Sequence, residues 1–112
     1  LIALMNDSKY LENEGYTRSF ISAGASKIPF AEDGTWREGF LEDLQNKVDA
    51  LYYDFCMHVS NYTGLSMEDV KATEAKMFSS SEALSLGLIN SVMTRSEFVN
   101  YILSKQQGAQ DA

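Results

Sequence analysis

The chain has 112 residues, 45% of them hydrophobic and 12% aromatic, which suits one globular domain with its own core. Its formal charge is -7 and its nine lysines and arginines are scattered, so no nucleic-acid partner is expected. A single cysteine excludes an internal disulfide, and no apolar run reaches the length of a membrane span.

The first part of the chain predicts a strand, a short helix and a second strand. Residues 1–5 are continuously apolar, as in a buried strand, and because the chain begins inside this run we expect a piece of a longer protein. Asn6 or Asp7 is suited to cap a short helix that ends before Gly15. Residues 16–22 alternate and are rich in aromatic and β-branched side chains, which favours a strand. This order is the pattern of a parallel βαβ unit.

The longest predicted element is an amphipathic helix over residues 35–63. Its apolar side chains recur at steps of three and four: Phe40, Leu44, Val48, Leu51, Phe55, Val59 and Tyr62. Thr35 and Glu38 have the spacing of a capping box, and Gly64 stands where a helix commonly ends. The opposite face is rich in carboxylates and amides. One side of this helix is therefore suited to a core and the other to water.

The C-terminal part predicts three shorter helices. Each begins at a Ser or Thr that an acidic residue follows three positions later, and these capping residues are Ser66, Ser79 and Thr94. The predicted helices cover residues 66–72, 79–86 and 94–105. Residues 88–93 are expected to form an extended segment or short strand. We place the domain at residues 1–105 and expect residues 106–112 to be a polar, frayed tail.

The loop over residues 23–33 carries the candidate for chemistry. Lys27 is the sole ionisable side chain between Ser19 and Ala31. In a packed loop with apolar neighbours its ammonium would lose hydration, which favours the neutral form that a lysine general base needs. Gly24 allows the backbone to turn tightly. On composition alone, however, an ordinary loop lysine that reaches water is the more frequent outcome.

A family resemblance favours the catalytic interpretation of Lys27. The loop motif is Ala23-Gly24-Ala25-Ser26-Lys27, followed by Pro29-Phe30. Later segments in the same order include Leu44-Gln45-Asn46-Lys47-Val48-Asp49, Tyr62-Thr63-Gly64-Leu65-Ser66, Ala72-Thr73-Glu74-Ala75 and Gly87-Leu88-Ile89. Together they resemble the signal peptide peptidase A family of serine peptidases, most of all its bacteriophage branch of capsid assembly, or head maturation, proteases.

The resemblance implies the C-terminal portion of an α/β, ClpP/crotonase-like fold and a serine-lysine dyad. In that family the lysine takes a proton from a serine hydroxyl, the serine attacks a peptide carbonyl, and backbone amides hold the oxyanion. Lys27 maps onto the lysine, whereas the serine and the oxyanion glycines would lie upstream of Leu1. The chain is therefore expected to be an inactive part of a longer serine endopeptidase.

The same resemblance implies a phage or prophage origin and a capsid or scaffold polypeptide as substrate. We place the protein in the cytoplasm of a bacterial host cell and expect neither a cofactor nor a metal. A homo-oligomer is expected because the predicted strand unit and the long helix leave sheet edge and apolar surface open. The chain departs from the family pattern at Ser26, where His is usual, and at Ile28-Pro29, where the link is usually longer. Ser80 and Asn90 replace the common Gly and Asp.

The remaining reactive side chains have plainer explanations. His58 is the only histidine, and its place beside the apolar stripe favours a partly buried or solvated residue over a catalytic one. Cys56 is expected to be a small core hydrophobe. The two lie two positions apart on a helix, face different sides and supply no usual metal site.

Two other functions are weighed against the protease. The alternative from a different class is a non-catalytic assembly module that self-associates through the long helix and the acidic surface. The acyl-CoA hydratase/isomerase group shares the fold and a similar Ala-x-x-x-Gly-Leu-Ile ending, but the loop from Gly24 to Lys27 does not favour it.

Overall fold

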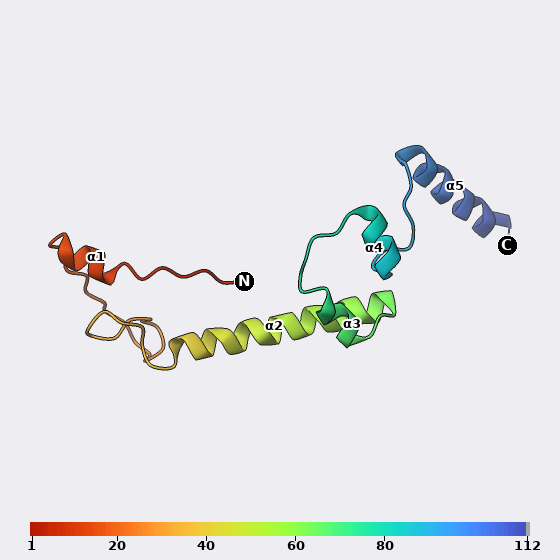
Figure 1. The fold of residues 1–112 in the computed structure, drawn as a ribbon. Helices are drawn as coiled ribbons and strands as arrows, with labels where there is room; N and C mark the ends of the chain where they lie inside the picture. Colours follow the sequence, from red (N-terminus) through yellow and green to blue (C-terminus); the bar gives the residue numbers. More distant parts are fainter. Residues whose placement is uncertain (112) are drawn as a thin grey trace. The chain divides into compact units, whose positions relative to one another are not determined.

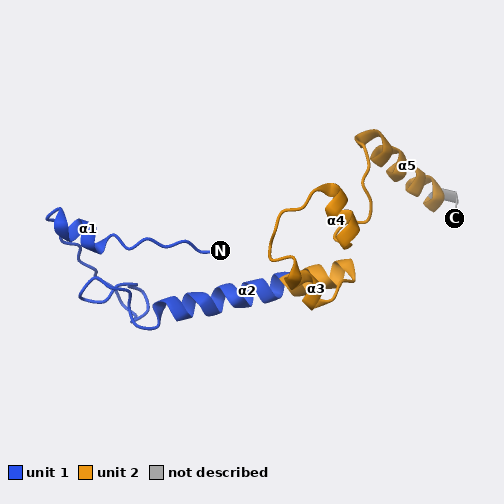
Figure 2. Ribbon diagram, viewed as in Figure 1, with its two compact units in different colours: residues 1–55 blue, residues 56–112 orange. Residues whose placement is uncertain are grey.

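A computed structural model describes residues 1–111, and in them five helices joined by irregular segments (Figure 1). The helices are α1 (Ser8–Asn13), α2 (Phe40–Thr63), α3 (Met67–Ala72), α4 (Ser80–Leu86) and α5 (Arg95–Asp111). The chain divides into two units, Leu1–Phe55 and Cys56–Ala112, and the division falls within α2 (Figure 2). None of the helices described combines the length and the apolar character that a membrane crossing requires.

The strands predicted over residues 1–5 and 16–22 do not form in the described part of the chain, and residues 88–93, predicted as an extended segment or short strand, form no strand there. The sole extended pairing there is an isolated antiparallel bridge between Phe30 and Trp36. A strand is stable only when its N–H and C=O groups pair with a neighbouring strand, and no ladder in residues 1–111 includes these segments. The predicted βαβ unit is therefore not formed in residues 1–111.

Helix α2 begins at Phe40, so the predicted start at Thr35 is wrong. Thr35 does not cap a helix, because its Oγ1 and its backbone N–H donate to the Asp33 carboxylate at 2.6 and 3.0 Å. Gly39 has a φ of 79°, in the left-handed region that lies outside a right-handed helix. The end of α2 at Thr63, before Gly64, is confirmed.

The helix starts predicted after residue 65 are confirmed by their caps. In each cap, the hydroxyl of the capping residue accepts a hydrogen bond from the backbone N–H three positions later. The pairs are Ser66 with Asp69 at 3.1 Å, Ser79 with Glu82 at 3.2 Å, and Thr94 with Glu97 at 3.2 Å. Gly87 follows α4 in the left-handed conformation, so this helix ends where the sequence predicts. Helix α5 continues past the predicted end at residue 105, since the next residues include good helix formers and no proline. Ala112, the end of the predicted tail, lies outside the described residues.

Few side chains among residues 1–109 are buried. Among residues 1–109, Cys56 and Val70 are the two in the buried class, and both belong to the unit Cys56–Ala112. The large apolar side chains of α2 that are exposed to at least a third are Leu41, Leu51, Tyr52, Tyr53, Phe55, Met57 and Tyr62. The stripe predicted to face a core is therefore only partly covered, and the chain presents more open apolar surface than a lone domain usually does.

Candidate functional site

Lys27 lies in a tight turn within the loop between Phe20 and Phe30. Its backbone N–H donates to the carbonyl oxygen of Gly24 at 3.2 Å. Gly24 has a φ of 98°, which side-chain-bearing residues rarely adopt, so the turn uses the freedom expected of this glycine. The Lys27 side chain is exposed, and within residues 1–111 its ammonium makes no hydrogen bond or ion pair. The packed surroundings considered for this lysine are therefore absent from the described residues.

Four stacked rings close the base of this loop. Phe20 and Phe30 have ring centroids 5.9 Å apart, Phe30 and Trp36 are 5.2 Å apart, and Trp36 and Phe40 are also 5.2 Å apart. Two backbone hydrogen bonds of 2.7 Å frame the bridge between Phe30 and Trp36. We call these four rings the aromatic column. It connects both ends of the Lys27 loop to the first residue of α2.

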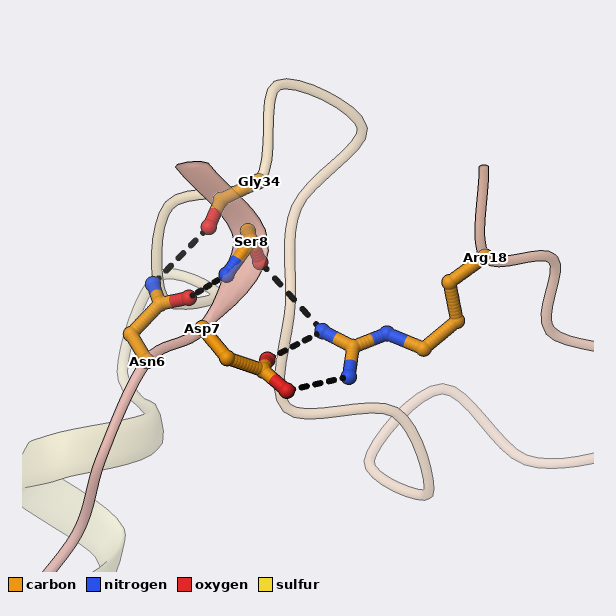
Figure 3. Close-up of polar contacts among 5 residues, drawn as sticks. All are labelled: Asn6, Asp7, Ser8, Arg18 and Gly34. Atoms are coloured by element: carbon orange, nitrogen blue, oxygen red, sulfur yellow. Dashed lines mark hydrogen bonds and ion pairs between the residues drawn. The ribbon is translucent and has the colours of Figure 1, made fainter. Parts of the chain in front are cut away.

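Arg18 joins the aromatic column to the start of α1. Its guanidinium carbon lies 4.6 Å from the centroid of Phe30 and 5.4 Å from that of Phe20. Its two terminal nitrogens contact the Asp7 carboxylate at 2.9 and 3.2 Å, and one of them also lies 3.4 Å from Ser8 Oγ (Figure 3). One planar side chain therefore contacts two rings and a carboxylate at the same time.

Asn6 supplies a second tie between the start of α1 and the turn before α2. Its Nδ2 donates to the carbonyl oxygen of Gly34 at 2.9 Å, and its Oδ1 accepts from the backbone N–H of Ser8 at 3.0 Å (Figure 3). Asp7 is at the N-cap position but makes no capping hydrogen bond with its side chain. Its carboxylate is paired with Arg18 instead.

Hydrogen bonds in this region favour the ionised form of two carboxylates, those of Asp7 and Asp33. A hydrogen bond from Arg18 lowers the pKa of Asp7 below the usual 3.8; burial opposes this shift, and the positive charge of Arg18 adds to it. Hydrogen bonds from the side chain and backbone of Thr35 lower the pKa of Asp33 in the same way. At neutral pH both members of the Arg18–Asp7 pair are therefore charged.

A cavity of about 780 Å³ lies beside Arg18 in the unit Leu1–Phe55. Its lining combines residues of α1 with Phe20, Phe30 and the turn around Asp33. Lys27 does not line it. The cavity and the candidate base are thus separate features, and no substrate-binding residue is assigned from the cavity.

The other two reactive side chains belong to the unit Cys56–Ala112. Cys56 is fully buried, as expected of a small core hydrophobe. His58 is exposed, and its ring centroid lies 4.6 Å from that of Tyr62. In the described residues no group of three or more His, Cys, Asp and Glu side chains is placed to hold a metal ion.

Sequence patterns do not single out Arg18, Asp7 or the two phenylalanines at the loop base. The alternation over residues 16–22 assigns Arg18 and Phe20 to one strand face, and a capping role is the use predicted for Asp7. The sequence feature that could have indicated the loop base is the aromatic residue on each side of the Lys27 loop. Flanking rings of this kind indicate that a loop is closed at its base.

Comparisons with known proteins give one family and two relatives. The model of peptidase family S49 matches residues 2–109. Capsid assembly protease C of Escherichia phage lambda is 30% identical over 99 residues, which are 88% of this chain and 23% of that protein. Head-tail preconnector protein GP5 of Enterobacteria phage P21 is 28% identical over 91 residues, 81% of this chain and 18% of that protein. The chain thus spans less than a quarter of either relative, and no solved structure gives a significant match.

Proposed function

Because this chain belongs to peptidase family S49, we propose that it supplies the general base of a serine endopeptidase, with Lys27 in that role. The observation that supports this most is the family match, which covers residues 2–109 and therefore the loop of Lys27. The Lys27 ammonium is exposed and has no hydrogen-bond or ion-pair partner in residues 1–111, so no contact there holds it away from a serine. A general base needs a side chain that is free to reach the hydroxyl it deprotonates.

The proposed chemistry needs one serine from outside this sequence. The neutral Lys27 amine takes the proton of the serine hydroxyl while the serine oxygen attacks the peptide carbonyl, and the resulting ammonium returns the proton to the leaving amine. We assign the serine and the oxyanion donors to another part of a longer protein, which fits the greater length of both relatives. By itself the chain would hold a base without a nucleophile and would show no peptidase activity.

A capsid or scaffold polypeptide is the proposed substrate. The support comes from the two phage relatives, which are named for capsid assembly and for the head-tail preconnector. A phage or prophage origin and action in the cytoplasm of a bacterial host cell belong to the same proposal. The net charge of -7 argues against a nucleic-acid substrate.

The second candidate function is a non-catalytic module for self-association in capsid assembly. The exposed apolar side chains of α2 favour it, because open apolar surface is typical of interaction sites. The two candidates differ in what they require of Lys27. A protease needs its amine, whereas an assembly module has no use for it.

The test of the proposed function is substitution of Lys27 in the full-length protein. Lys27→Ala and Lys27→Arg should each lower the rate of cleavage of a capsid-protein precursor by about 10²- to 10⁴-fold, since alanine has no base and a guanidinium stays protonated. Lys47→Arg, an exposed lysine on α2, is the matched control and should keep its rate. His58→Ala should stay within a few-fold of the wild type.

Two outcomes would contradict this assignment. An active Lys27→Arg protein together with an inactive His58→Ala protein would replace the dyad with a histidine-based triad. Normal cleavage by both Lys27 variants would show that Lys27 is not the general base. Incubation of residues 1–112 with a fluorophosphonate probe is a further check, because serine labelling that requires Ser22 or Ser26 would place the nucleophile inside this chain.

A further inference from the structure

We infer that Arg18 positions Lys27 by holding closed the base of the loop that carries it, an inference that rests on the proposed role of Lys27. The side chain of Lys27 has no hydrogen bond or ion pair of its own in the described chain. Its backbone is held locally by the turn with Gly24. Where the amine lies is therefore set by the two ends of the loop.

The two ends of the loop meet at Phe20 and Phe30. Their stack, at 5.9 Å, is the longest of the three ring contacts in the aromatic column. Phe20 is also exposed to 45%, so burial alone gives this contact limited support. The closure of the loop consequently depends on what else contacts both rings.

Arg18 makes that additional contact. Its guanidinium lies within 5.4 Å of both ring centroids, and Asp7 holds it there through a hydrogen bond and an ion-pair contact. The planar, delocalised guanidinium suits both contacts, because it stacks on rings and presents paired N–H groups to a carboxylate. Asp7 in turn stands at the N-cap position of α1, so the loop base is tied to a structured element.

This arrangement matters for chemistry because general-base catalysis depends on distance. A displacement of about 1 Å of a reacting group costs up to about 100-fold in rate. Opening the loop base would let the Lys27 turn move as a unit without altering the lysine itself. The expected signature is a loss in kcat with KM nearly unchanged.

The experiment compares Arg18→Gln, Arg18→Lys and Asp7→Asn with the wild type in the full-length protein. Arg18→Gln should lower kcat by about 10- to 100-fold while KM changes less than about two-fold. Arg18→Lys should recover part of that loss, since an ammonium keeps the charge for Asp7 and the rings but lacks the paired N–H groups. Asp7→Asn should give a smaller loss. Arg95→Gln, which removes an exposed cation from the start of α5, should match the wild type.

A second readout, independent of activity, is limited proteolysis with a lysine-specific endoproteinase. Cleavage after Lys27 should be faster in Arg18→Gln than in the wild type and in Arg95→Gln, because an open loop is a better protease substrate. Mass spectrometry identifies the cut.

The inference and the proposed function fail in different ways. If Lys27→Ala is inactive but Arg18→Gln keeps kcat within about two-fold, the inference is overturned and the proposed function stands. If Arg18→Gln loses kcat without faster cleavage after Lys27, Arg18 acts by another route and the inference is again overturned. An active Lys27→Ala protein overturns both. If Arg18→Gln does not fold, a wild-type kcat in Asp7→Asn and Arg18→Lys is the result that overturns the inference.

Discussion

Arg18 is a single residue that connects three separate segments of the chain. It belongs to the segment that enters the Lys27 loop and contacts both the start of α1 and the segment that leaves the loop. The ion pair with Asp7 is partly exposed, at 34% for Arg18 and 45% for Asp7, so its contribution to global stability is small. Its importance is local, because it holds a guanidinium against two rings.

The Arg18–Asp7 pair predicts a pH dependence with a definite sign. Because Arg18 lowers the pKa of Asp7 in the folded protein, the pair contributes stability above pH 3.8, and this is lost as pH falls through the lowered pKa. Titration of the Asp7 carboxyl carbon by NMR should give a pKa below 3.8 in the wild type and a higher pKa in Arg18→Gln.

Asp33 is the internal control for this titration. Thr35, not Arg18, lowers the pKa of Asp33, so Arg18→Gln should leave the Asp33 titration unchanged. The same Asp7 pKa in both proteins would show that the ion pair does not form in solution.

At the scale of the helices, a glycine substitution tests where α2 begins. Gly39 has a φ of 79° and open space where an added methyl group would lie, so Gly39→Ala should cost about 1–2 kcal/mol from backbone strain alone. Gly108 lies inside α5, also with open space, so Gly108→Ala should stabilise by about 0.5–1 kcal/mol. Urea unfolding of the two variants measures both effects.

The opposite sign at Gly39 would support a helix that starts at Thr35. In such a helix Gly39 would be an interior residue, and Gly39→Ala would then stabilise the protein as Gly108→Ala does.

Helices with local start and stop signals are predicted correctly from the sequence. Ser66, Ser79 and Gly87 act through residues three or four positions away, so the information that positions them is present in a short window. The start of α2 is missed for a related reason. Thr35 fits a cap in sequence, but the turn that it forms with Asp33 competes for the same hydroxyl.

Strands and the loop base depend on distant partners and are predicted less well. Periodicity shows that residues 16–22 suit a strand but not which segment would pair with them, and within residues 1–111 no segment does. The contacts of Arg18 with Asp7 and Phe30 likewise join residues that are far apart in sequence. The prediction of Lys27 comes from a family motif, and the structure adds the closed loop that holds it.

For the molecule as a whole, the family match tests the predicted fold class, whereas the described structure tests the individual helices and strands. Peptidase family S49 supports an α/β fold in general. The specific ClpP/crotonase-like arrangement stays a prediction, since the described residues contain helices and one isolated bridge.

Open apolar surface on α2 predicts self-association of the chain. Leu51 is 69% exposed, Phe55 60% and Tyr62 81%, and association would remove such side chains from water. Light scattering of residues 1–112 at micromolar concentration should give the mass of a dimer or a larger assembly. Leu51→Glu should shift the mass toward the monomer, whereas Asn46→Glu on the polar face should not. A monomer mass for the wild type at high micromolar concentration would refute the prediction.

Cys56 makes the opening of one unit measurable by chemistry. Its thiol is 0% exposed and it is the single cysteine of the chain. A thiol reagent reaches it only when the surrounding structure opens, so its labelling rate relative to that of a free cysteine, at fixed pH, gives the fraction of time spent open. Opening of the unit Cys56–Ala112 can therefore be followed separately from events at Lys27, which belongs to the other unit.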